Sequence, residues 1–129
     1  MKKRLFCLLF VFVCLLFASC SSSAADQIHP DYYAAGKDAL GIAEAYLASK
    51  IDLSEAKQRI ESISSALDSL PLLPENDPQY EQSDLVRLYT SAVCNSFGLQ
   101  QSENRTLQLQ EDLQEYTARL NELLGLVSR

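Results

Sequence analysis

This sequence has few of the residue types that commonly form metal sites and catalytic sites. Its 129 residues include no tryptophan, one histidine, four cysteines and four glycines. Because His29 is the only imidazole and no cysteine pair stands at ligand spacing, a metal site is not expected. The chain also has no glycine-rich phosphate loop and no Gly-x-Ser-x-Gly nucleophile motif. We therefore expect neither enzymatic activity nor a cofactor.

Cysteines and long apolar runs are also few beyond the N-terminus. Cys7 and Cys14 lie in an N-terminal apolar run, which leaves Cys20 and Cys94 in the rest of the chain. Cys94 is expected to be a buried, small apolar residue rather than a reactive thiol. No later apolar run reaches 18 residues, so no later segment is expected to span a bilayer. The domain is expected to be stabilised by packing, without a disulfide.

The first nineteen residues have the three parts of an export signal. A basic start over 2–4 is followed by an uncharged apolar run over 5–17. As a helix that run would cover roughly 20 Å, which is short for a permanent anchor. Ala18 and Ser19 are small, as a signal peptidase site requires. The sequence therefore predicts a cleaved signal peptide over 1–19.

The order apolar, small, small, cysteine at Phe17-Ala18-Ser19-Cys20 resembles the lipobox of bacterial lipoprotein signal peptides. Phe17 stands where that pattern most often has leucine. The resemblance implies a lipid on Cys20, cleavage between Ser19 and Cys20, and acyl chains such as palmitate. It also implies attachment to the outer face of the cell membrane, or to an outer membrane. The alternative is an ordinary secretory signal with an incidental Cys20.

The charge balance after the cleavage site is strongly acidic. All seventeen acidic residues follow Cys20, whereas three of the eleven basic residues precede it. The mature chain therefore has a formal charge of about −9, and it lacks the basic patch that a nucleic-acid partner needs. Anionic headgroups would repel such a body, so a lipid rather than a basic surface must hold it at the membrane.

The residues after the signal divide into a tether and one domain. Small and polar residues without periodicity predict a flexible tether over 20–30, in which His29 is a solvated linker residue. A helical domain is expected over 31–129. The loop 71–78 contains three prolines, and Leu72 and Leu73 in it are expected to cover one end of the core; an exposed contact loop is the alternative.

Apolar residues at three- and four-residue spacing predict four helices in this domain. The first follows Pro30, with Asp31 as a cap or first-turn acid, and Asp52 caps the second, which ends at Pro71. The third begins at Asp77-Pro78 and stops near Gly98. The fourth follows a polar stretch from Gln100 to Arg105, in which Ser102 is the candidate cap. The apolar face expected for the third helix consists of Leu85, Val86, Leu88, Tyr89, Ala92, Val93 and Phe97. The fold predicted is all-α, an antiparallel four-helix bundle. The alternative is three helices, with a long C-terminal helix kinked near Gly98.

The last helix has a narrow apolar stripe that resembles one side of a coiled coil. This stripe is either the inner face of an intramolecular bundle or a face for a protein partner or a second copy. Its members are Leu109, Leu113, Tyr116, Leu120 and Leu123. The function expected is a membrane-anchored helical interaction module of the cell envelope. The alternative is a lipoprotein that holds a small apolar or cationic ligand between its helices.

Overall fold

The computed structural model describes residues 23–100 and 106–126, and this part of the chain contains five helices and no strand. The predicted all-α class is therefore confirmed. No helix in these residues combines the length and apolar character that crossing a membrane needs. The helices are α2 (Ala24–Gln27), α3 (Pro30–Leu47), α4 (Leu53–Ser69), α5 (Tyr80–Leu99) and α6 (Thr106–Leu123).

The capping residues in the sequence predict the first residues of α3 and α4 closely. Asp52 caps α4, because its Oδ1 accepts a hydrogen bond of 2.8 Å from the Glu55 backbone N–H. In α3 the cap is His29 rather than Asp31, and Pro30 takes the first helical position. For α5 the prediction began too early: Asp77 forms a turn whose Oδ1 accepts from the Gln79 N–H at 2.8 Å, and the helix begins at Tyr80.

Two helices end in the same backbone motif. After α3, Ser49 has a φ of 57°, and its N–H donates to the Tyr46 carbonyl at 2.9 Å. After α6, Gly125 has a φ of 67°, and its N–H donates to the Glu122 carbonyl at 3.1 Å. In both, the following N–H reaches back five residues, which is the Schellman arrangement. The helix α5 runs through Gly98 and ends at Leu99, one residue beyond the predicted stop.

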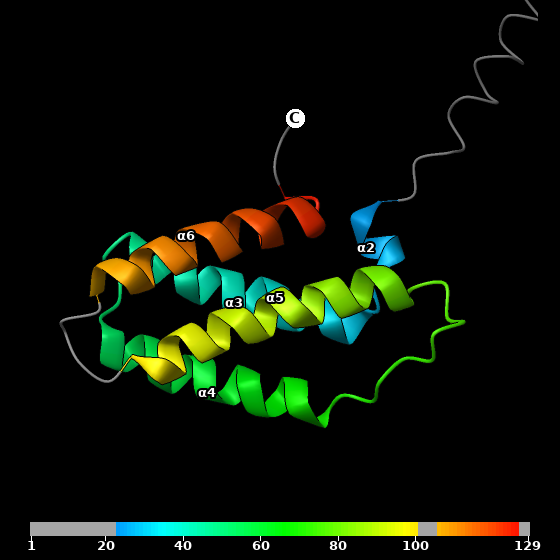
Figure 1. The fold of residues 1–129 in the computed structure, drawn as a ribbon, viewed down its shortest axis with the longest axis horizontal. Coiled ribbons are helices and arrows are strands. Elements are labelled where there is room, and N and C mark those ends of the chain that lie inside the picture. The colour runs from blue at the N-terminus through cyan, green and yellow to red at the C-terminus, as the bar shows by residue number, and fades with distance from the viewer. Residues whose placement is uncertain (1–22, 101–105, 127–129) are drawn as a thin grey trace, which may run out of the picture.

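The long helices pack side by side around one core (Figure 1). Helices α3 and α5 contact each other, and each of them also packs against both α4 and α6. Helices α5 and α6 make the most extensive pairwise contact. Residues 101–105 lie outside the described residues. They include the proposed cap Ser102 and most of the polar stretch from Gln100 to Arg105.

The core combines the apolar faces that the periodicity predicted in α3, α4 and α6. In α5 the prediction is confirmed at Val86, Val93 and Phe97, which are buried. It is wrong at Leu88, which is 58% exposed, and it did not include the buried Ser83 and Thr90. The buried apolar side chains are Ile28, Tyr32, Ala39, Leu40, Ala43, Ala56, Ile60, Leu67, Val86, Val93, Cys94, Phe97, Leu109, Leu113, Leu120 and Leu124.

Small residues on α3 allow α5 to approach closely. A Cβ atom added to Gly36 would lie 2.8 Å from Val86 Cγ1 and 3.3 Å from Thr90 Oγ1. Both neighbours are fully buried, and Thr90 Oγ1 already donates to the Val86 carbonyl at 2.7 Å. Because these side chains have no free space to move into, position 36 has room for glycine only.

We predict that Gly36→Ala lowers the free energy of unfolding by about 1 kcal/mol. Overpacking a core costs about 1–3 kcal/mol, and the better helix propensity of alanine returns up to about 1 kcal/mol. Urea unfolding followed by circular dichroism measures the change. Gly41→Ala is the matched control in the same helix, since a Cβ there meets nothing within 4 Å and should stabilise the protein. Equal effects of the two variants would contradict a tight α3–α5 contact.

Candidate functional site

Residues Ser23–His29, which we call the strap, connect the N-terminal segment to the bundle. The strap begins with a local cap: Asp26 Oδ2 accepts hydrogen bonds from the Ser23 N–H at 3.1 Å and from its hydroxyl at 2.9 Å. The short helix α2 follows, and Ile28 after it has an extended backbone and a fully buried side chain. A buried isoleucine ties this segment to the core, so residues 23–30 belong to the folded body. The flexible tether predicted over 20–30 is wrong for this part.

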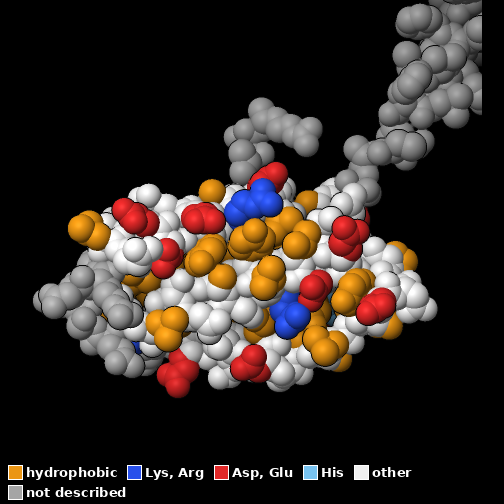
Figure 2. Space-filling view, in the orientation of Figure 1, with side chains coloured by type: hydrophobic (Ala, Val, Ile, Leu, Met, Phe, Trp, Pro, Cys, Tyr) orange, Lys and Arg blue, Asp and Glu red, His pale blue; other side chains and the backbone are white. Residues whose placement is uncertain are grey.

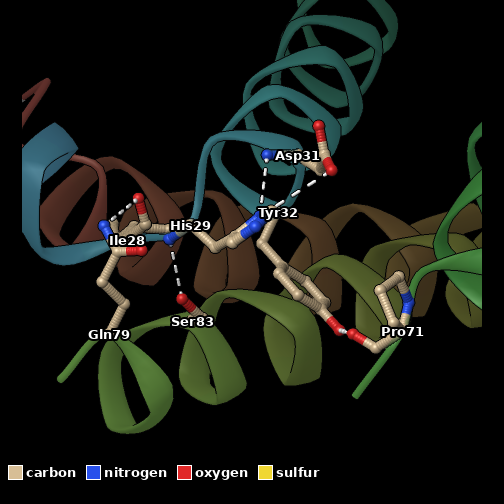
Figure 3. Close-up of polar contacts among 7 residues, drawn as sticks. All are labelled: Ile28, His29, Asp31, Tyr32, Pro71, Gln79 and Ser83. Carbon is tan, nitrogen blue, oxygen red and sulfur yellow. Dashed lines mark hydrogen bonds and ion pairs between the residues drawn. The ribbon is translucent and has the colours of Figure 1, made fainter. Parts of the chain in front are cut away.

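Polar contacts from α5 and the residue before it hold the strap in place (Figure 3). Gln79 Nε2 donates to the carbonyl groups of Asp26 at 3.0 Å and Ile28 at 3.3 Å. The His29 N–H donates to Ser83 Oγ at 2.8 Å. These contacts join residues more than fifty positions apart in the chain. They satisfy strap backbone groups that a buried Ile28 would otherwise remove from water.

His29 is a structural residue of this junction, and the prediction of a solvated linker residue was wrong. Its ring is half-buried, and Nδ1 accepts from the Asp31 N–H at 3.4 Å as the cap of α3. The ring also lies edge-on to Tyr32, with ring centroids 6.0 Å apart. Across the described residues, no group of His, Cys, Asp and Glu side chains is placed to hold a metal ion.

Tyr32 joins the next loop to the same end of the bundle. Its side chain is 3% exposed, and its hydroxyl donates to the Pro71 carbonyl at 2.8 Å (Figure 3). Nearby, Asp84 Oδ1 accepts from Arg87 at 2.8 Å, and this contact raises the pKa of the Arg87 guanidinium above its usual value. The loop 71–79 is therefore fixed against α3 at its start and against the strap, through Gln79, at its end.

The residues that follow α6 lie at the same end of the bundle. We call this end, which consists of the strap, the loop 71–79 and residues 124–126, the strap end. A Cβ added to Gly125 would lie 2.9 Å from Ala24 Cβ, so the turn after α6 packs directly on the strap. Tyr33 Oη donates to the Leu124 carbonyl at 3.5 Å. At this end Leu73 packs partly against the core, as predicted, but Leu72 is 75% exposed.

The predicted interaction stripe of α6 lies mostly inside the protein. Leu109, Leu113 and Leu120 are at most 3% exposed, and only Tyr116 and Leu123 reach the surface in part. The three buried leucines pack within the core, so they cannot contact a partner while the bundle is closed. The intramolecular alternative therefore accounts for these three side chains.

An aromatic face remains where α5 and α6 meet at the surface. Tyr89 and Tyr116 have ring centroids 6.3 Å apart, and the Arg119 guanidinium lies 5.7 Å from the centre of the Tyr89 ring. Leu88 is exposed beside Tyr89. Figure 2 shows hydrophobic side chains gathered on this side of the molecule over α5 and α6. We call Leu88, Tyr89, Ala92, Tyr116 and Arg119 the α5–α6 face; sequence periodicity missed it because it placed Leu88 in the core.

Two open grooves flank α5. One of about 380 Å³ lies between α5 and α6, with Ser96, Asp112 and Tyr116 among its lining residues. The other, of about 320 Å³, lies between α4 and α5 and is lined by Lys57, Glu61 and Cys94 among others. Both exceed the volume of about 300 Å³ at which small-ligand sites begin. Both are surface grooves rather than enclosed cavities.

Cys94 is the free cysteine of the described residues, and it is structural. The residue is 5% exposed. Burial, with a contribution from the charge of Asp68, raises the pKa of its thiol to about 11. Because the thiolate is the reactive form, the thiol is inert at neutral pH. This agrees with the prediction of a buried, small apolar residue.

Comparison with known proteins returned no matching protein-family model, no matching curated protein and no matching solved structure. The functional argument therefore rests on the residues of this chain. Ser19 and Cys20, the predicted cleavage and lipid-attachment residues, lie outside the described residues.

We predict that Ile28→Ala lowers the free energy of unfolding by about 2–4 kcal/mol, as expected when a buried isoleucine leaves a cavity. Chemical unfolding of the purified protein measures this change. Leu72→Ala is the control, because it removes exposed apolar carbon at the same end of the bundle and should change stability by less than about 0.5 kcal/mol. A negligible effect of Ile28→Ala would show that the strap does not belong to the folded body.

Proposed function

We propose that this protein is a lipoprotein of the bacterial cell envelope, anchored through Cys20, whose helical body binds another envelope protein. The anchor is supported by the basic start, the short apolar run and the lipobox-like Phe17-Ala18-Ser19-Cys20. A single acyl chain binds a membrane only marginally, so two or three chains on one residue give lasting attachment. In this proposal the signal peptide covers 1–19, and the body begins within a few residues of the anchor.

We further propose that the body is an antiparallel four-helix bundle of α3, α4, α5 and α6. The connection between α3 and α4 covers only residues 48–52, which favours antiparallel neighbours. The contact between α5 and α6 favours the same arrangement for that pair, rather than one long kinked helix. The strap is an addition to this bundle and closes one end of it.

The observation that carries the interaction role is the α5–α6 face. Tyrosine and arginine are enriched among the residues that dominate binding energy in protein interfaces. Here the Tyr89 ring contacts both the Tyr116 ring and the Arg119 guanidinium, and Leu88 beside Tyr89 is 58% exposed. Because the rings are already packed together, little side-chain entropy is lost when a partner covers them. Acidic residues dominate the rest of the body, which favours a partner with a basic rim around its contact surface.

A second candidate function is the binding of a small ligand in a groove beside α5. The volumes of about 380 Å³ and 320 Å³ are large enough for one, and the acidic side chains Asp112 and Glu61 would favour a cationic ligand. Ligand sites commonly bury most of their ligand, however, and these grooves are open to solvent. The interaction role therefore has the stronger support.

We predict that Cys20→Ala abolishes metabolic palmitate labelling and moves the protein out of the membrane fraction. The thioether sulfur is the attachment atom, and no other residue can replace it. Cys94→Ala is the matched control and should keep both the label and the membrane location, because Cys94 is buried. Membrane retention of Cys20→Ala together with an unlabelled parent protein would refute the anchor.

We predict that a photo-cross-linking residue at Leu88 captures an envelope protein in intact cells, whereas the same residue at Gln58 does not. Both positions are exposed, but Gln58 lies on α4, away from the α5–α6 face. Adding Arg119→Ala to the Leu88 probe should reduce the adduct, since it removes part of that face. Capture of the same proteins from positions 58 and 88 would contradict the proposed surface.

A further inference from the structure

The strap end presents two large apolar side chains that the fold leaves exposed, Leu72 and Leu126, and Leu72 is the more exposed of the two. Leu72 is 75% exposed, whereas Leu73 beside it packs partly against the core. Prolines at 71 and 74 restrict the backbone on both sides of the pair. The Pro71 carbonyl accepts the hydrogen bond from Tyr32. Leu72 is therefore held at the surface by a loop whose two ends are fixed to the body.

The predicted lipid-bearing residue is close to this end along the chain. Cys20 precedes Ser23 by three residues, and three residues extend over at most about 10 Å. Gln79, at the end of the loop that carries Leu72, holds the strap by two hydrogen bonds. The helix α5, at 20 residues, is about 30 Å long. Lipid on Cys20 would therefore keep the strap end at the bilayer and leave the opposite end free.

Charge does not account for a membrane contact at this end. Its exposed acids include Asp26, Asp31 and Glu75, and the described residues 23–33 and 70–82 contain no lysine or arginine. Arg87 on α5 lies near Leu73, but it is paired with Asp84. Anionic headgroups would repel these carboxylates. Apolar side chains remain as the groups that a bilayer would accept, and Leu72 is the most exposed of those at this end.

We propose that Leu72 inserts into the leaflet that holds the lipid on Cys20, so that the bundle meets the membrane with its strap end. This rests on the proposed lipidation of Cys20. One leucine binds a bilayer weakly in free solution, but the covalent anchor makes its insertion an intramolecular event at high effective concentration. Leu72 therefore orients a body that the acyl chains already hold. The turn 48–52, between α3 and α4, points away from the membrane.

An environment-sensitive fluorophore on Leu72→Cys tests this in the full lipidated protein, reconstituted alone into phosphatidylcholine vesicles. Its emission should shift to the blue and be quenched by lipids that carry a nitroxide. The same fluorophore on Ala48→Cys, at the opposite end, should show neither change. Cys94 is buried and does not compete for the label. Replacing part of the phosphatidylcholine with an anionic lipid should weaken the quenching at position 72, and added salt should restore it.

The outcomes separate this inference from the proposed function. Protein that sediments with the vesicles while probes at 72 and 48 both report water refutes the insertion and leaves the lipid anchor standing. Protein that does not sediment refutes the anchor, and the insertion with it. Quenching at 72 that increases with anionic lipid refutes the apolar contact. Because the vesicles contain no other protein, a partner protein at Leu72 would appear as absence of quenching.

Discussion

The close approach of α3 and α5 is the contact on which the other helices depend. Gly36 brings the two backbones together, and each helix then offers its remaining faces to both α4 and α6. Within the described residues Cys94 is a free thiol, so no disulfide in this part of the chain stabilises the helix packing. The separation of α3 and α5 therefore affects where both α4 and α6 pack. It also sets where α5 presents Ser83 to the strap.

Periodicity and capping residues predicted the helices well where the buried face is apolar. The inner faces of α3, α4 and α6 and the cap at Asp52 follow directly from the residues. The face of α5 was predicted only in part: Val86, Val93 and Phe97 are buried as expected, but Ser83 and Thr90 also occupy buried positions, where the pattern expects apolar residues. Each is small and satisfied: Thr90 donates to the Val86 carbonyl, and Ser83 accepts from the His29 N–H. Because buried polar residues do not add to the apolar periodicity, the sequence pattern did not identify Ser83 and Thr90 as core residues. It assigned Leu88 to the core instead.

The strap was missed for a related reason. Ile28 is a single apolar residue among small and polar ones, and one residue has no periodicity. Its burial depends on Gln79 and Ser83, which lie more than fifty positions later in the chain. The composition of a short segment indicates its own tendency to fold. It does not show which residues far along the chain will contact that segment. In α6 the apolar stripe was detected, but its pattern alone could not show whether it contacts the core or a partner. In the structure, most of its leucines pack in the core.

The strap also changes what a lipid anchor does. A free tether of ten residues would let the body range over about 35 Å, whereas three residues allow about 10 Å. In the proposed lipidated protein, the body would then stay within about 10 Å of the bilayer. Tyr89 lies nine residues along α5 from its start at the strap end, which is about 14 Å at the rise of an α-helix. In the proposed anchored protein, a partner that binds the α5–α6 face would therefore have to reach close to the membrane surface, which favours a partner that is itself embedded in or attached to that membrane.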